Sequence, residues 1–189
     1  MKFTLIALLA FCLGLAVGCS KNLKEFEETK AFAEIKAKAE AGDAYTQFNL
    51  GLMYYKGEGV LKDNKEAVKW WRKAAEQGDA GAQNNLGGMY AEGEGVQEDN
   101  KEAVKWWRKA ADQGQVIAQY NLGVMYAKGE GVLQDYVTAY VWVNIAEAND
   151  FDVKKFEGLL EKKMTSEQIA KSEELFIEMV KKNPKLLNK

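Results

Sequence analysis

Residues 80–115 read AGAQNNLGGMYAEGEGVQEDNKEAVKWWRKAADQGQ, and they repeat residues 44–79 at 26 of 36 positions. Residues 116–151 repeat the same pattern at 16 of 36 positions, and no gap separates the three units. A fixed period of this length indicates a repeat architecture, in which each unit buries its apolar face against the next. We therefore expect one domain of tandem units.

The first half of each unit is predicted to be a helix, over residues 43–56, 80–92 and 116–128. Each of these helices is followed by a Gly-Glu-Gly-Val segment. Paired glycines supply the positive backbone angles of a helix C-terminus and a tight reversal. The second half of each unit is therefore expected to run back along the first.

The second helix of the first unit has recognisable start and stop signals. Asp63 stands at the N-cap, and Glu66 follows three residues later as an aspartate version of the capping box. Gly78 ends the helix and is separated by one residue from the next unit. The counterparts in the second unit are Asp99, Glu102 and Gly114. Such short links predict antiparallel neighbouring helices that stack as a solenoid.

The flanks of the array are expected to act as caps, because a solenoid needs end units with one apolar and one polar face. Residues 25–43 resemble the second helix alone and predict an N-terminal capping helix, a half repeat. Residues 152–184 predict C-terminal capping helices, the last of them started by Thr165. Residues 185–189 follow the single proline and are expected to be a flexible tail.

The N-terminus has the layout of a secretory signal peptide over residues 1–18, with residues 19–24 as a tether. Its apolar run is shorter than the ~20 residues of a membrane-spanning helix. The segment from Leu15 to Cys19 resembles a bacterial lipobox, which implies a lipid on Cys19. Cleavage by an ordinary signal peptidase is the alternative, because Ala16 replaces the favoured leucine.

Cysteine usage favours the lipid, because loss of Cys12 with the signal leaves Cys19 as an unpaired thiol in an oxidising compartment. The predicted location is the periplasm, as a lipoprotein anchored in a membrane. Ser20 carries no obvious inner-membrane retention signal, which favours the outer membrane. The oligomeric state is not fixed by the sequence.

Composition argues against nucleic-acid binding and against catalysis. Removing Lys2 with the signal changes the net charge from −2 to −3, and nucleic acids are bound by clustered lysines and arginines. The chain has no histidine, so the commonest general base and zinc ligand is missing. No serine lies in a known nucleophile motif. We expect no enzyme, no cofactor and no metal site.

Tryptophans recur at the repeat period, as Trp70-Trp71, Trp106-Trp107 and Trp142. They lie beside repeated alanines, as core positions of stacked helices do. The first of each pair is expected to be buried, because large aromatic side chains dominate interior packing. The second is expected to be partly exposed.

These units resemble the Sel-one-like repeat family, a relative of the tetratricopeptide repeat. The resemblance is carried by Leu50-Gly51-x-x-Tyr54, Gly57-x-Gly59-Val60, Trp70-Trp71 and Lys73-Ala74-Ala75-x-Gln77-Gly78. It implies an all-α fold, a right-handed superhelical solenoid of stacked antiparallel helix pairs. It also implies an adaptor in protein complexes, and no common reaction.

The first helices carry a second apolar stripe, roughly 130° around the helix from the stripe that packs. In tetratricopeptide-like solenoids the corresponding positions line the concave surface, which implies a groove here. The alternative is that adjacent first helices bury these side chains against one another. The candidate ligand-binding residues are Tyr45, Phe48, Asn49, Leu52, Tyr55, Asn84, Asn85, Gly88, Ile117, Tyr120, Asn121 and Val124.

Two amide side chains recur in every unit, an asparagine and a glutamine two residues before it. In the related tetratricopeptide domains, a recurring asparagine can clamp the backbone of a bound peptide. The alternative is that a repeated amide satisfies a loop or a helix end in every unit.

The predicted function is a non-enzymatic interaction scaffold or adaptor in the bacterial cell envelope. It would bind a peptide or an extended segment of a partner protein in the concave groove, and the membrane through the lipid on Cys19. The alternatives are an immunity or inhibitor protein for a toxin, or a hydrolase of cell-wall material or β-lactams.

Overall fold

The structure, a computed structural model, describes residues 30–188. The predicted signal peptide 1–18, the tether 19–24 and the lipidation candidate Cys19 lie outside these residues. No helix of residues 30–188 is long and apolar enough to cross a lipid bilayer.

The described part of the chain is helical and contains no strand. Residues 30–40 form a helix, which belongs to the predicted N-terminal cap. The helices that follow are α2 (Ala44–Lys56), α3 (Asn64–Glu76), α4 (Ala80–Glu92), α5 (Asn100–Ala111), α6 (Val116–Lys128), α7 (Tyr136–Glu147), α8 (Lys154–Glu161) and α9 (Ser166–Lys182). A short 3-10 helix, η1 (Pro184–Leu186), comes after α9.

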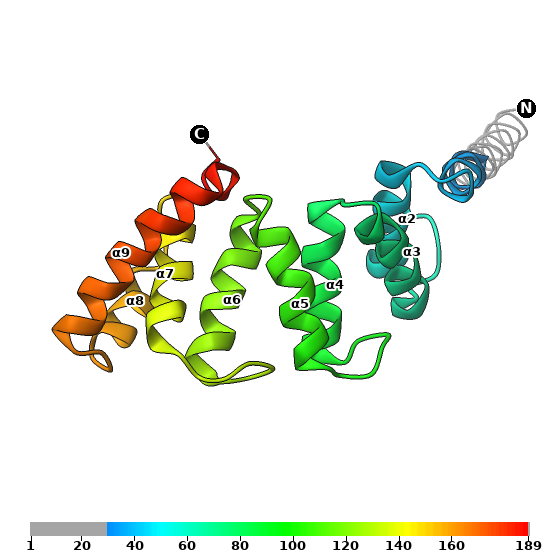
Figure 1. The fold of residues 1–189 in the computed structure, drawn as a ribbon. Helices are drawn as coiled ribbons and strands as arrows, with labels where there is room; N and C mark the ends of the chain where they lie inside the picture. Colours follow the sequence, from blue (N-terminus) through cyan, green and yellow to red (C-terminus); the bar gives the residue numbers. More distant parts are fainter. Residues whose placement is uncertain (1–29, 189) are drawn as a thin grey trace, which may run out of the picture.

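The helices form successive hairpins, arranged in one elongated row from blue to red (Figure 1). The most extensive packing joins the two helices of a repeat, α2 with α3, α4 with α5 and α6 with α7. The second helix of one repeat then packs on the first helix of the next, α3 on α4 and α5 on α6. The predicted all-α solenoid of stacked helix pairs is confirmed.

The helix starts follow the sequence signals, with one difference. The side chain of Asp63 accepts hydrogen bonds from the backbone N–H groups of Lys65 and Glu66, as an N-cap does. The carboxylate of Glu66 does not complete a capping box but accepts from the Trp70 indole at 3.2 Å. The N–H of Asp63 donates to the Tyr54 carbonyl at 2.9 Å instead. Half of the predicted capping box is therefore replaced by a bond to the preceding helix.

Repeated glycines bring the two helices of each repeat into close contact. An ideal Cβ on Gly51 would lie 2.5 Å from the Trp71 ring, and one on Gly87 would lie 2.6 Å from Trp107. The Trp71 indole N–H donates to the Phe48 carbonyl at 3.2 Å. Trp71 and Trp107 are 2% and 6% exposed. The expectation that the second tryptophan is partly exposed was therefore wrong, because the glycine opposite leaves room for the whole indole.

The recurring glutamines connect consecutive repeats. Gln83 is buried, and its side-chain amide donates to the Ala75 carbonyl near the end of α3. Its Oε1 accepts from Gln113 at 2.8 Å. Gln47 and Gln119 occupy the same place in the other repeats, bonded to the carbonyls of Ala39 and Ala111. The glutamines therefore satisfy helix ends, which is a structural role.

The C-terminal cap begins with a short helix and continues with a long one. The first of the predicted capping helices is α8, whose N-cap Val153 offers no side-chain hydrogen bond. The predicted start of the last helix is confirmed, because Thr165 and Gln168 form a complete capping box at α9.

The expectation of a flexible tail at residues 185–189 was wrong for the described residues of that segment. Leu186 is 1% exposed, and its carbonyl accepts from the buried amide of Gln119 at 2.9 Å. The Asn188 side chain donates to the Gly114 carbonyl at 3.0 Å. An apolar residue that fits between helix ends, together with paired amides, holds the segment against α6 and the end of α5.

Candidate functional site

A groove of about 240 Å³ lies between the first helices α2 and α4 and extends to α6. Six of the twelve predicted ligand-binding residues line it. These six are Leu52, Tyr55, Asn84, Asn85, Gly88 and Asn121. Half of the residues predicted to bind a ligand therefore lie together in one groove on the first helices.

The floor of the groove is open at Gly88. An ideal Cβ on Gly88 would meet no atom within 4 Å, although Gly88 is part of helix α4. Its neighbour Gly87 faces the Trp107 ring instead. Adjacent helix residues point about 100° apart, so α4 uses one glycine for packing and the other for the groove.

The aromatic wall of the groove is held in place from behind. The ring of Tyr55 lies 5.4 Å from the Trp71 ring, centroid to centroid, at an interplanar angle of 48°. The ammonium of Lys62 lies 5.3 Å from the centre of the Tyr55 ring. Because Trp71 is fixed by its own hydrogen bond to Phe48, the wall is pre-organised, which lowers the entropy lost when a ligand binds.

The asparagines behave differently from the glutamines. Asn84 and Asn85 form only a long bond to each other, 3.4 Å from Nδ2 to Oδ1. The Oδ1 of Asn84 is buried and has no partner among residues 30–188. The amide of Asn121 makes no hydrogen bond within the same range. The amides of Asn85 and Asn121 line the groove and can therefore pair with the backbone N–H and C=O groups of a bound segment.

Sequence reasoning missed four lining residues, Lys56, Trp71, Met89 and Glu92. Trp71 was expected to be partly exposed, but it is buried, and its ring supports that of Tyr55. Lys56 and Glu92 occupy the same position of consecutive first helices and give the groove one charge of each sign. The change from a positive to a negative side chain between the two repeats could have identified these residues from the sequence.

The remaining predicted residues lie outside the groove. Tyr45 and Ile117 are 71% and 48% exposed, and Phe48 packs against Gly81 of the next repeat. Asn49 and Val124 are half-buried. None of these residues is fully buried.

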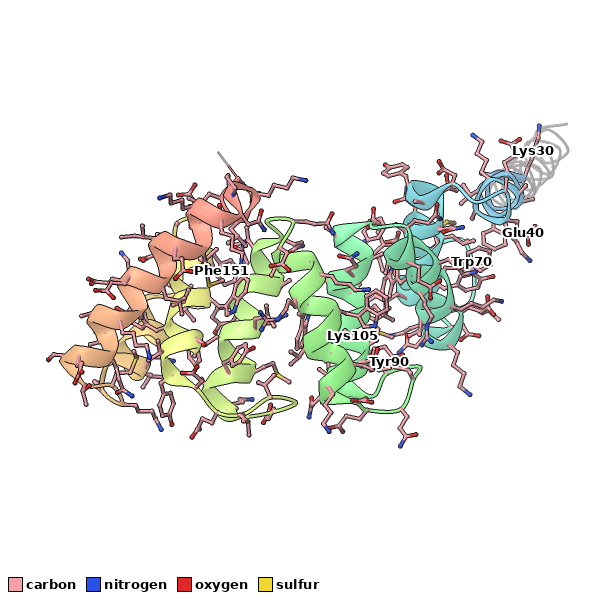
Figure 2. The ribbon with its side chains drawn as sticks, in the orientation of Figure 1. Lys30, Glu40, Trp70, Tyr90, Lys105 and Phe151 are labelled. Atoms are coloured by element: carbon pink, nitrogen blue, oxygen red, sulfur yellow. The ribbon has the colours of Figure 1, made fainter. Side chains whose placement is uncertain are left out.

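Tyr120 belongs to the C-terminal cap instead of the groove. Its ring lies 5.1 Å from the ring of Phe151, which is labelled in Figure 2, and 5.7 Å from that of Phe156. It lines a separate hollow of about 410 Å³ with residues of α8. The cap therefore packs on Tyr120, where the resemblance had implied a groove wall.

No group of three or more His, Cys, Asp or Glu side chains that could hold a metal ion is found among residues 30–188. The residues that line the groove include one carboxylate, Glu92, and no serine, threonine, cysteine or histidine. The arrangement offers aromatic, amide and charged contacts, which are the means of binding a polypeptide segment.

The family model of the Sel1 repeat matches residues 44–79, 80–115 and 116–150. The chain belongs to the Sel1 repeat family. Sel1-repeat proteins generally mediate protein–protein interactions, and their fold is typically a non-enzymatic scaffold. Comparison with curated proteins gives no match.

Two solved structures of Sel1 repeat proteins are similar to this chain. One is a protective antigen present in uropathogenic Escherichia coli strains, with 38% identity and a TM-score of 0.75 over 84% of this chain. This chain spans about a third of the length of that antigen, 34%. The other is a Sel1 repeat protein from Oxalobacter formigenes, with 39% identity and a TM-score of 0.62 over 68% of this chain and 98% of its own.

Proposed function

We propose that this Sel1 repeat protein is a non-enzymatic scaffold of the bacterial cell envelope that holds an extended segment of a partner protein in the α2–α4–α6 groove. The observation that supports this most is the open floor at Gly88, next to a supported aromatic wall at Tyr55 and the amides of Asn85 and Asn121. An extended segment offers backbone groups to the amides and a side chain to the wall.

The envelope location rests on the N-terminal sequence, in which an apolar run precedes Cys19. The similarity to a protective antigen of Escherichia coli also favours a place outside the cytoplasm. Labelling cells with a palmitate analogue tests the anchor, because Cys19→Ala should abolish the label. Label retained in Cys19→Ala would contradict the lipid.

The groove is tested by filling it. In Gly88→Leu the new side chain occupies the floor without meeting a neighbour near its Cβ, so the fold should persist while the partner is excluded. Gly158→Leu is the matched control, because Gly158 is also helical, is equally open and lies on α8, away from the groove.

The measurement is photo-crosslinking in envelope extracts, with a crosslinking amino acid at Leu52 in the groove or at Leu61 in an exposed loop. Mass spectrometry then identifies the attached peptide. We expect one partner segment at Leu52, lost in Gly88→Leu and kept in Gly158→Leu. The proposal fails if Gly88→Leu captures the same peptide as the wild type, or if Leu61 captures it equally well.

A further inference from the structure

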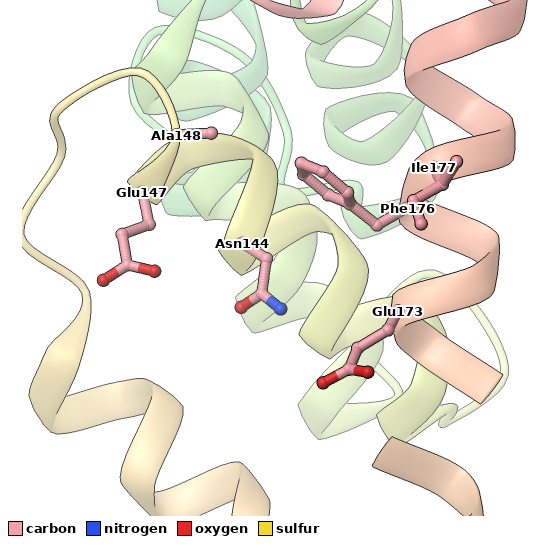
Figure 3. Close-up of a pocket in the computed structure, with 6 residues that line it drawn as sticks. All are labelled: Asn144, Glu147, Ala148, Glu173, Phe176 and Ile177. Atoms are coloured by element: carbon pink, nitrogen blue, oxygen red, sulfur yellow. The ribbon is translucent and has the colours of Figure 1, made fainter. Parts of the chain in front are cut away.

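A second hollow differs from the groove in its position and in the residues that line it. It has a volume of about 650 Å³ and lies between α7 and α9. It is lined by Asn144, Glu147, Ala148, Glu173, Phe176 and Ile177 (Figure 3). None of the first helices that form the groove contributes to it.

The apolar part of this hollow comes mainly from α9. Ile177 is 64% exposed, although aliphatic side chains of this size are usually buried. Phe176, its neighbour, points toward α7 and is half-buried against the core (Figure 3). The two side chains offer a surface on which an aliphatic side chain can pack.

The polar part consists of two carboxylates that have no cation. Glu147 and Glu173 are exposed and lie on either side of the Asn144 amide (Figure 3). Neither makes an ion pair among residues 30–188, where the pairs of glutamate with lysine lie elsewhere. No basic side chain lines the hollow.

Two further observations show that this region has acceptors in excess. The Oδ1 of Asn144 is buried and lacks a hydrogen-bond partner among the described residues, which is rare in folded proteins. On α8, burial raises the pKa of Glu157, and the charge of Glu147 raises it further. A positive charge in the hollow would offset the charge of Glu147 that acts on Glu157.

We infer that the α7–α9 hollow is a second docking site, which takes a segment of a partner protein with a basic side chain next to an aliphatic one. The basic group lies between Glu147 and Glu173, and the aliphatic group packs on Phe176 and Ile177. Charge complementarity selects this occupant, because an acidic or neutral segment would leave both carboxylates unpaired. The site is separate from the groove, so each can be tested without the other.

The test uses the chain from residue 19 and a synthetic pentapeptide with blocked ends, in which one arginine lies between two isoleucines and a glycine stands at each end. A second peptide carries citrulline, which keeps the shape of arginine without the charge. Two-dimensional NMR locates the bound peptide, and a titration gives the Kd. We expect shifts at residues 144–148 and 173–177, and a Kd at least about tenfold weaker for the citrulline peptide.

Variants distinguish the carboxylates of the hollow from general surface charge. The double variant Glu147→Gln and Glu173→Gln should weaken binding of the arginine peptide at least about tenfold. The control variant Glu174→Gln and Glu178→Gln removes the same charge from exposed positions of α9 outside the hollow and should bind as the wild type does. Gly88→Leu should also bind this peptide normally, which separates this site from the groove.

Three outcomes would overturn the inference. The citrulline peptide could bind as tightly as the arginine peptide, or the shifts could centre on Leu52 and Gly88. Sedimentation without peptide could show a dimer that Ile177→Ser converts to a monomer, which would make the hollow an interface between two copies of this chain. Circular dichroism of each variant checks that the helices are intact.

Discussion

The second and third repeats have the same glycine at the contact between their two helices, but they use it differently. In the second repeat Gly87 receives the Trp107 ring, whose indole N–H reaches the Asn84 carbonyl at 3.1 Å. In the third repeat Val143 replaces the tryptophan, and an ideal Cβ on Gly123 would lie 2.6 Å from Val143 Cγ2 and 3.1 Å from the Ala139 carbonyl. A smaller side chain lets the backbones approach, so the glycine is required in both repeats for different reasons.

The turns that close these two repeats also differ. Gly114 has φ +87, and an ideal Cβ there would lie 2.5 Å from Asn188 Oδ1, because the C-terminal segment covers the turn. Asp150 occupies the corresponding position of the third repeat with φ +64, which is uncommon for a residue with a Cβ. The closing turn of the second repeat is therefore covered by the C-terminal segment, whereas the closing turn of the third repeat is exposed.

The largest loss of stability should follow the removal of Trp107, which packs on Gly87 in the second repeat. Trp107→Ala should lower the free energy of unfolding by ~3–5 kcal/mol, because it leaves a cavity and removes the hydrogen bond to the Asn84 carbonyl. Val143→Ala removes fewer atoms and should cost less. Urea denaturation of both variants measures the difference, and equal losses would show that the two contacts are equivalent.

Removal of the covering segment should have the next largest effect. Leu186→Ala should cost ~2–5 kcal/mol, because Leu186 is 1% exposed. Leu133→Ala is the control, since Leu133 is 91% exposed in a loop and should change stability by less than about 0.5 kcal/mol. A loss for Leu186→Ala no larger than that of the control would mean that the segment is not docked in solution.

Adjacent glycines of α4 should give opposite results. Gly87→Ala places a Cβ 2.6 Å from the Trp107 ring and should cost ~1–3 kcal/mol. Gly88→Ala meets nothing within 4 Å and should gain up to about 1 kcal/mol from helix propensity. Thermal and urea unfolding measure both, and a loss in Gly88→Ala would contradict an open floor.

The smallest effect is expected at the closing turns. Asp150→Gly should gain up to about 1 kcal/mol, because glycine adopts a positive φ without steric cost. The reverse exchange Gly78→Asp, at φ +100 with open space around it, should lose stability for the same reason. Changes of the same sign in these two variants would show that backbone strain is not the cause.

The repeats and most helix ends could be predicted, because their signals are local and recur. Asp63, Thr165 and Gly78 act within a few residues of themselves, so a single sequence contains the whole reason for them. The docked segment could not be predicted. Leu186 lies in residues 185–188, a segment too short to show a helical or strand pattern. Its hydrogen-bond partner Gln119 is distant in sequence.

The site was predicted in part for a similar reason. Gln47 and Asn49 recur with one period and carry the same chemical group, so repetition alone could not separate their roles. They are two residues apart in a helix and point about 200° apart, so only packing shows which one faces a helix end. Tyr120 was misplaced because the α8 cap, which covers it, has no counterpart in the inner repeats.

The docked C-terminal segment has a consequence for synthesis. Its bonds from Asn183 to Asp112 and from Asn188 to Gly114 join residues 71 and 74 positions apart. The N-terminal repeats emerge first, in synthesis and in export alike, so they can fold before residues 183–188 arrive. During that interval the place of Leu186, between the end of α5 and the start of α6, is open to solvent. A chaperone, or a second copy of the chain, then has access to an apolar surface that the finished protein covers.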